Sequence, residues 1–70
     1  MTEVRAEMTA NVWQVTGTVG QEVQVGDVLM ILESMKMEIP VEAPHAGTVS
    51  AICVGEKSQV SEGDVLVVLN

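Results

Sequence analysis

An internal repeat constrains the fold of this 70-residue chain more than any other feature of its sequence. When the sequence is shifted by 37 positions, residues 10–32 align with residues 47–69. Seven aligned pairs are identical: Val12/Val49, Val23/Val60, Gly26/Gly63, Asp27/Asp64, Val28/Val65, Leu29/Leu66 and Leu32/Leu69. Two copies are too few for a solenoid, which usually needs at least about three stacked units. The repeat therefore predicts two similar halves that share one core and are related by an approximate twofold axis.

The hydrophobic pattern within each copy predicts short β-strands. Residues 12–15 and 49–54 are rich in β-branched side chains, which favour strands. A Gly-Asp pair at 26–27 and again at 63–64 precedes an aliphatic run of strand length. Because glycine gives the backbone the freedom that a tight turn requires, each Gly-Asp pair indicates a turn into a strand.

The remaining segments fit the same class of fold. Residues 4–8 alternate apolar and polar side chains, as in a half-buried strand. Pro40 and Pro44 limit the residues between them to a sheet edge or a strand end. Residues 32–37 contain helix-forming side chains but are too few for a helix. We expect a single all-β domain over residues 1–70, a small barrel or sandwich.

The charge balance excludes several classes of partner. Ten acidic and three basic residues give a formal charge of −7, which disfavours binding to nucleic acid phosphates and to anionic membranes. The longest aliphatic runs, residues 28–32 and 65–69, are far shorter than the roughly 20 residues that cross a bilayer. The single cysteine, Cys53, excludes an internal disulfide and fits a reducing compartment. We therefore expect a cytoplasmic protein without nucleic acid or membrane partners.

No catalytic or metal-binding constellation is recognisable. His45 is the only histidine, and a metal site would need further His or Cys ligands, so we expect His45 to lie in a solvated loop. Cys53 has no basic neighbour that would activate its thiol, and we interpret it as structural. The sequence also lacks a phosphate-binding loop and a paired-carboxylate arrangement. We therefore expect neither a metal site nor an enzyme that acts alone.

Lys36 is one of only two lysines, and it lies between the two copies of the repeat. If each copy forms half of a symmetric fold, the connector includes a hairpin on or near the axis, and the Lys36 amine projects into water. The neighbouring Met35 and Met37 are flexible thioethers that can offer a soft contact surface to a partner. An ordinary hairpin lysine, with the methionines partly packed inward, is the alternative that composition and spacing leave open.

Three segments resemble the biotinyl/lipoyl attachment family, which includes the biotin carboxyl carriers. They are Glu33-Ser34-Met35-Lys36-Met37-Glu38, Ala43-Pro44-His45-Ala46-Gly47-Thr48-Val49 and Glu62-Gly63-Asp64-Val65-Leu66. The similarity extends roughly from Ala6 to Leu69 and is closest to the simple, stand-alone carriers. It implies a flattened β-barrel or sandwich of two four-stranded antiparallel sheets with pseudo-twofold symmetry. It also implies that Lys36 is the acceptor lysine at a hairpin tip.

The same resemblance implies a carrier function rather than catalysis. A biotin protein ligase would attach biotin to Lys36, guided by Glu33, Ser34, Met35, Met37 and Glu38. The lysyl-biotin arm would then carry CO2 between the sites of a biotin carboxylase and a carboxyltransferase. Two alternatives remain: a carrier with lipoate on Lys36, and an unmodified binding or regulatory module. Methionines on both sides of the lysine resemble the biotin acceptors more than the lipoyl members.

Overall fold

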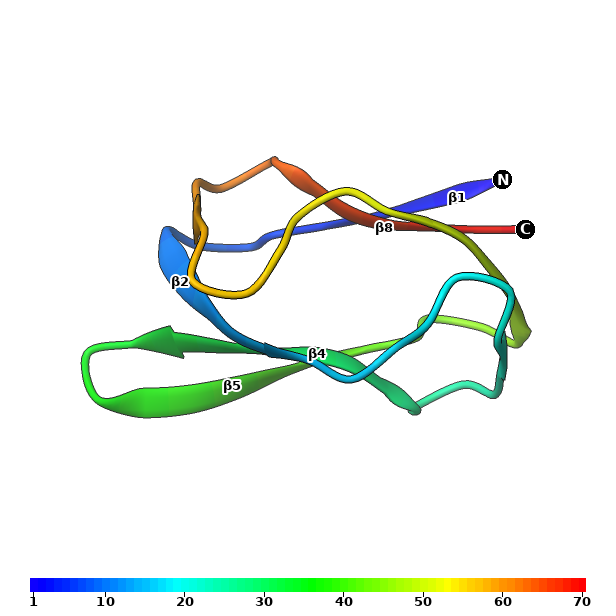
Figure 1. The fold of residues 1–70 in the computed structure, drawn as a ribbon, viewed down its shortest axis with the longest axis horizontal. Helices are drawn as coiled ribbons and strands as arrows, with labels where there is room; N and C mark the ends of the chain where they lie inside the picture. The colour runs from blue at the N-terminus through cyan, green and yellow to red at the C-terminus, as the bar shows by residue number, and fades with distance from the viewer.

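The protein is a sandwich of two four-stranded sheets in which every strand pair is antiparallel (Figure 1). The computed structural model describes residues 1–70. Its strands are β1 (Thr2–Arg5), β2 (Ala10–Val15), β3 (Glu22–Val23), β4 (Val28–Ser34), β5 (Met37–Glu42), β6 (Gly47–Ile52), β7 (Gln59–Val60) and β8 (Val65–Leu69). One sheet has the order β1-β8-β6-β3 and the other β5-β4-β2-β7. The two sheets are not joined into a closed barrel. Of the two expected forms, barrel and sandwich, the protein therefore adopts the sandwich.

The sequence repeat corresponds to the exchange of one sheet for the other. A shift of 37 residues takes β2 onto β6, β3 onto β7, β4 onto β8 and β1 onto the last four residues of β5. Irregularities in the strand register follow the same rule. The register shifts at Trp13 in β2 and at Ser50 in β6, and again at Leu29 in β4 and at Leu66 in β8. The predicted pseudo-twofold organisation is thus confirmed down to the bulges of the strands.

The Gly-Asp pair closes the same turn in both halves. In the first half, the Asp27 N–H donates to the Gln24 carbonyl, and the Gln24 N–H donates to Oδ2 of Asp27 at 2.9 Å. Gly26, between them, has a φ of 88°. In the second half, Ser61 and Asp64 make the same two bonds around a glycine with a φ of 92°. The aspartate satisfies the turn's backbone, and the glycine supplies the positive φ that a type II turn requires.

Replacement of either turn glycine by valine is expected to destabilise the fold. Gly26→Val and Gly63→Val should each lower the free energy of unfolding by about 1–3 kcal/mol, because a β-branched residue tolerates positive φ poorly. A Cβ at either position would meet no atom within 4 Å, so the loss comes from the backbone alone. Gly55→Val is the matched control, since Gly55 has equally open surroundings but no positive φ. Urea unfolding that is identical for all three variants would contradict this explanation of the turns.

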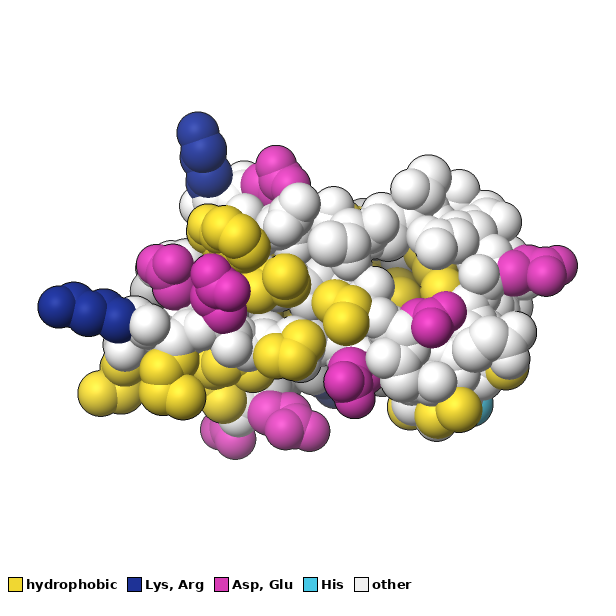
Figure 2. Space-filling view, turned by 90° about the horizontal axis from the view of Figure 1, so that it is seen from below, with side chains coloured by type: hydrophobic (Ala, Val, Ile, Leu, Met, Phe, Trp, Pro, Cys, Tyr) yellow, Lys and Arg dark blue, Asp and Glu magenta, His cyan; other side chains and the backbone are white.

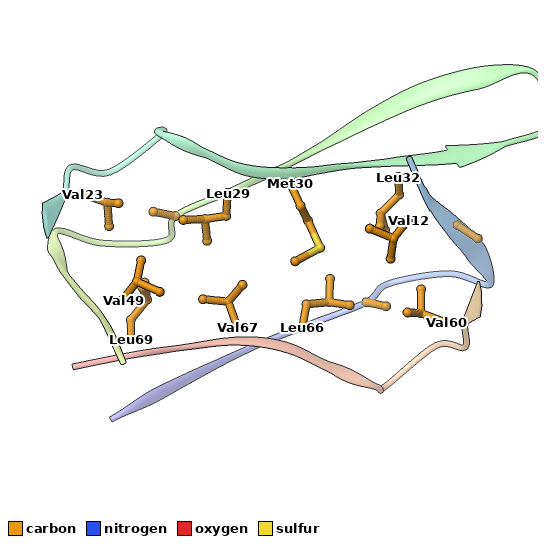
Figure 3. Close-up of a cluster of buried hydrophobic side chains, with 13 residues drawn as sticks. Val12, Val23, Leu29, Met30, Leu32, Val49, Val60, Leu66, Val67 and Leu69 are labelled. Carbon is orange, nitrogen blue, oxygen red and sulfur yellow. The ribbon is translucent and has the colours of Figure 1, made fainter. Parts of the chain in front are cut away.

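The core consists of 13 buried residues, all of them apolar. Twelve of them form six pairs separated by 37 residues: Ala6/Ala43, Val12/Val49, Val23/Val60, Leu29/Leu66, Met30/Val67 and Leu32/Leu69. Figure 3 shows these side chains meeting between the two sheets. A chain without Phe or Tyr therefore builds its core from small aliphatic residues that the two halves contribute equally.

The edges of the sheets agree with the proline pattern. Pro40 lies in β5, an edge strand, where a missing N–H is tolerated.

Two predicted strands are shorter than expected. The strand β1 ends at Arg5 rather than reaching residue 8, and β6 ends at Ile52 rather than at residue 54. Residues 32–37 belong to β4, β5 and the turn between them, so no helix forms there.

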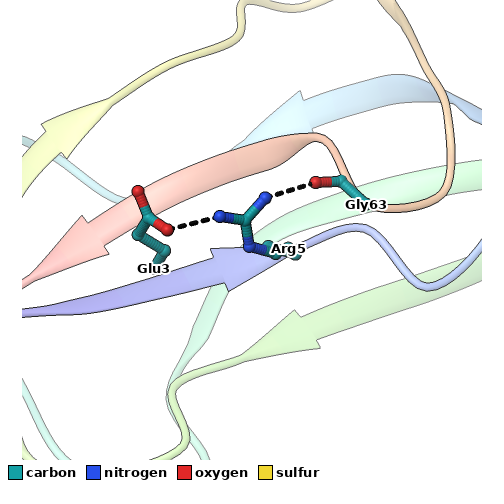
Figure 4. A network of polar contacts seen from close by, with 3 residues as sticks. All are labelled: Glu3, Arg5 and Gly63. Carbon is teal, nitrogen blue, oxygen red and sulfur yellow. Dashed lines mark hydrogen bonds and ion pairs between the residues drawn. The ribbon is translucent and has the colours of Figure 1, made fainter.

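Arg5 fixes the edge strand β1 to the rest of its sheet (Figure 4). Its Nη1 donates to the Gly63 carbonyl at 2.8 Å, and its Nη2 pairs with the carboxylate of Glu3. Both charged side chains are about half exposed, which limits the stability that the ion pair adds. The bond to Gly63 links β1 directly to the Gly-Asp turn that precedes β8.

The β4–β5 hairpin and the chain termini lie at opposite ends of the long axis (Figure 1). Thr2 pairs with Leu69, so the two termini are neighbours. The expectation that the hairpin lies on or near the twofold axis is wrong, because the 37-residue shift takes the hairpin onto the termini. The structure has no helix with the length and apolar character needed to cross a membrane.

Candidate functional site

Lys36 lies in a two-residue hairpin loop at one end of the molecule. Ser34 of β4 pairs with Met37 of β5, which leaves only Met35 and Lys36 to connect the strands. Their φ angles are 52° and 66°, the pattern of a type I′ turn. This turn matches the twist of the flanking strands, but it normally contains Asn-Gly or a similar pair.

The residues of this turn are unfavourable for its backbone. The left-handed backbone conformation costs a residue with a side chain roughly 1–2 kcal/mol of conformational free energy. Here two such residues follow one another. The β4–β5 ladder, which runs from Val28 and Glu42 to Ser34 and Met37, holds the strands in a register that forces the turn. Backbone strain of this kind gathers at functional sites. The choice of Met-Lys here is therefore not explained by folding.

The side chains of the hairpin are presented to solvent. Met35 is 91% exposed and Met37 63% exposed, and Lys36 is exposed. The only ion pair in the structure joins Arg5 to Glu3, and no hydrogen bond involves the Lys36 amine. Of the two methionines, Met35 is thus not packed inward, and Met37 is covered only in part. The alternative of partly packed methionines is wrong for Met35 alone.

The remaining predicted recognition residues form the base of the same hairpin. Glu33 and Glu38 are exposed and lie directly opposite each other on β4 and β5, and Ser34 is half-buried beside them. Like charges directly opposite each other destabilise a strand pair. Figure 2 shows a basic side chain projecting at the hairpin end, with apolar and acidic side chains behind it. The hairpin thus combines a free amine, two thioethers and two carboxylates on one small surface.

A hairpin with Asn-Gly in place of Met35-Lys36 is expected to be more stable. The double variant Met35→Asn, Lys36→Gly should raise the free energy of unfolding by about 1–3 kcal/mol, because both residues then suit positive φ. Met8→Asn is the control, since Met8 lies outside any turn with a positive φ and should give no gain. Thermal and urea unfolding measure the difference. If the double variant were no more stable than the parent, the backbone strain assigned to this turn would not exist.

Lys57, the other lysine, shares the backbone conformation of Lys36 but not its surroundings. It is exposed, has a φ of 72° and replaces Gly20 of the first half. Its neighbour Glu56 accepts a hydrogen bond from the Val15 N–H at 3.1 Å. The Lys57 turn is thus tied to β2 and has no flanking methionine.

His45 lies in the loop between β5 and β6, as expected, but its ring is not fully solvated. Its ring is half-buried, with Nε2 2.6 Å from the Thr2 hydroxyl and Nδ1 2.7 Å from the Ala46 carbonyl. Because a carbonyl only accepts, Nδ1 donates to Ala46, and in the neutral ring Nε2 then accepts from the Thr2 hydroxyl. His45 therefore holds the first strand in place, at the end of the molecule opposite Lys36.

Cys53 is exposed and points away from the half-buried Ile52 and Val54. The thiol contributes nothing to the core, so the interpretation of Cys53 as a structural residue is wrong. No group of three His, Cys, Asp or Glu side chains is placed to hold a metal ion.

Trp13 is the only aromatic residue of the chain, and its sequence pattern predicts no role for it. It lies in β2, where the register shifts, and its side chain is 49% exposed. The neighbouring Asn11 pairs with Glu33 at the base of the hairpin. The repeat could have drawn attention to Trp13. Ser50 occupies the corresponding position in the second half, so the fold itself does not require an indole there.

Comparisons with known proteins agree with this geometry. The biotin/lipoyl family model, described as "Biotin-requiring enzyme", matches residues 2–69. The chain is 46% identical over 68 residues to the biotinylated protein TB7.3 homolog of Mycobacterium leprae (strain TN), covering 97% of this chain and 96% of that protein. It is 42% identical over 67 residues to the biotin/lipoyl attachment protein of Bacillus subtilis (strain 168), covering 96% and 92%.

The fold is also found within a much larger enzyme. The structure matches the crystal structure of Kluyveromyces lactis urea carboxylase with a TM-score of 0.93 and 32% identity. The match covers 99% of this chain but only 6% of the carboxylase chain. The family match over residues 2–69, the two relatives of similar length and the shared fold lead to one conclusion. This chain belongs to the biotin/lipoyl attachment family.

Proposed function

We propose that Lys36 is the residue to which a biotin protein ligase attaches biotin, and that the chain then acts as a carboxyl carrier. One observation carries this proposal. The Lys36 amine has no partner within the protein and stands at the apex of a strained hairpin, between two exposed methionines. An amine placed in this way is open to a second protein from several directions.

The attachment uses Lys36 as a nucleophile. Its uncharged amine attacks the carbonyl carbon of the mixed anhydride of biotin and AMP. An amide bond forms, the bond between the carbonyl carbon and the phosphate oxygen breaks, AMP leaves, and the amine releases a proton. The charge of the chain changes from −7 to −8, because one lysine loses its cation. The hairpin contains only exposed carboxylates near the amine, so the ligase must supply the activation. The carrier contributes the position of the amine.

The rest of the fold favours transport between two active sites. When attached, biotin carries an activated carboxyl group from a biotin carboxylase to a carboxyltransferase. A flexible lysine side chain on a stiff sandwich keeps the reactive group close to both enzymes and raises its effective concentration. The hairpin lies far from the termini (Figure 1), so partners can approach Lys36 without contacting the chain ends.

The charge of the hairpin supports partners with a basic surface. Glu33 and Glu38 repel each other in the free protein, and a cationic surface would relieve that repulsion. The overall charge of −7 would steer the chain toward the same kind of surface. We assign ligase recognition to Glu33, Ser34, Met35, Met37 and Glu38. Because attachment of biotin consumes ATP, the proposal also places the protein in the cytoplasm.

Biotin is favoured over lipoate by the proteins that the chain resembles. One relative is described as biotinylated, and the fold recurs in a urea carboxylase. The Bacillus subtilis relative is described as a biotin/lipoyl attachment protein, which keeps lipoate on Lys36 as the second candidate. The third candidate, an unmodified binding or regulatory module, predicts that Lys36 carries no group at all.

Intact-mass measurement of the chain purified from its native host tests these candidates. We expect the mass to increase by one biotinyl group and the protein to bind streptavidin. A lipoyl increment, with no streptavidin signal, would replace biotin by the second candidate. An unmodified mass in cells with an active biotin protein ligase would favour the binding module and overturn the carrier function.

A further inference from the structure

The five methionines differ greatly in their exposure. Met30 is fully buried in the core, and Met8 is partly exposed. Met1, Met35 and Met37 are the three most exposed, and Met1 reaches 92%. Met1 lies at the end of the molecule opposite the hairpin (Figure 1). Two of the three most exposed thioethers therefore flank the one amine that the proposed function uses.

An exposed thioether reacts with peroxides. A sulfur lone pair attacks one oxygen of the peroxide, an S–O bond forms and the O–O bond breaks, and the second oxygen leaves as water after taking up a proton. The sulfur loses two electrons, and the peroxide gains them. The product, methionine sulfoxide, is polar and chiral, and methionine sulfoxide reductases restore the thioether. In that reversal, two thiols become a disulfide and the oxygen leaves as water.

Oxidation at these two positions changes the surface that a partner must cover. Met35 precedes Lys36 and Met37 follows it, so the Cα atoms of both lie about 3.8 Å from that of Lys36. A protein that binds around the Lys36 amine therefore meets Met35 and Met37 as the residues on either side of it. Thioethers fit an apolar contact, whereas a buried sulfoxide oxygen would lose its hydrogen bonds to water.

We propose that Met35 and Met37 form a reversible, peroxide-sensitive modification site that blocks the loading of Lys36 while it is oxidised. The consequence for loading rests on the proposed function, but the selective oxidation of the pair does not. The fold itself tolerates the modification, because neither side chain belongs to the core. The buried Met30 stays reduced for as long as the sandwich is folded.

The first measurement maps oxidation along the chain. The unloaded full-length chain, freed of loaded molecules with avidin, is treated with a graded series of hydrogen peroxide concentrations. Peptide mass spectrometry then gives the sulfoxide fraction at each methionine. We expect Met1 and Met35 to oxidise first, then Met37, and Met30 last. Oxidation of Met30 as fast as Met35 would overturn the proposal, because the pair would then not be selectively exposed.

The second measurement follows loading by a purified biotin protein ligase with biotin and ATP. We expect kcat/KM for the oxidised chain to fall at least tenfold, which corresponds to about 1.4 kcal/mol. Sulfoxide reductases with dithiothreitol should restore the original rate. The double variant Met35→Leu, Met37→Leu should keep its own rate within twofold after peroxide, whatever that rate is. Met8→Leu is the matched control and should lose activity as the parent chain does.

The variant Cys53→Ser serves as the background for all measurements, because the exposed thiol also reacts with peroxide. Trp13 fluorescence during thermal unfolding checks that the oxidised chain is folded. If the untreated chain is loaded and the oxidised chain is loaded equally fast, this inference is wrong and the proposed function stands. If the untreated chain is not loaded at Lys36, the proposed function fails instead.

Discussion

Lys36→Arg is expected to abolish the incorporation of biotin, with a loss of at least about a hundredfold, because a guanidinium group stays protonated and cannot act as the nucleophile. The substitution keeps the positive charge and a long side chain at the apex of the hairpin. A loss of incorporation can therefore be assigned to the amine rather than to charge or folding. Intact mass and streptavidin binding, after co-expression with a biotin protein ligase, measure the effect.

Lys57→Arg is a closely matched control, because both lysines are exposed and both have a positive φ. It should incorporate biotin as the parent chain does. The two sites differ in their surroundings, since only Lys36 stands in a two-residue hairpin between methionines. If biotin were lost in Lys57→Arg and retained in Lys36→Arg, the assignment of the acceptor would be reversed. Incorporation in both single variants would mean that the ligase does not select the hairpin.

Leu29→Ala and Leu66→Ala are each expected to lower the free energy of unfolding by about 3–4 kcal/mol. Both side chains are buried between the sheets, so their truncation removes apolar contacts and leaves a cavity. Small domains are stable by roughly 0.05–0.15 kcal/mol per residue. Either variant should therefore lose a large part of its stability, which urea unfolding followed by Trp13 fluorescence can measure.

The two leucines also test the twofold symmetry of the core. They are 37 residues apart and occupy corresponding bulges in β4 and β8, so their losses should agree within about 1 kcal/mol, although individual sites vary with local relaxation. Val25→Ala is the control, because its side chain is 68% exposed and it should change stability by no more than about 0.5 kcal/mol. A loss confined to one leucine would show that the two halves do not share the core equally.

The repeat also explains why so much of the fold could be predicted. The two copies carry aliphatic residues at matching positions. These residues can be buried together only if the two halves face each other across a common interior. The Gly-Asp pairs could be assigned to turns because positive φ favours glycine strongly. The lengths of β1 and β6 were less predictable, since a strand ends where its partner strand ends, and the sequence of one strand does not contain that information.

The fold class, the pseudo-twofold repeat, the turns at Gly26 and Gly63 and the interest of Lys36 could all be inferred from the amino-acid sequence. These features depend on local backbone preferences and on the spacing of apolar residues, which a single chain displays directly. The structure was needed to see that the hairpin lies opposite the termini, that Met35 and Met37 are exposed while Met30 is buried, and that His45 contacts Thr2. The physical reason is that exposure and long-range contacts depend on how the two sheets pack, and five chemically identical methionine side chains reveal nothing of that packing in the sequence.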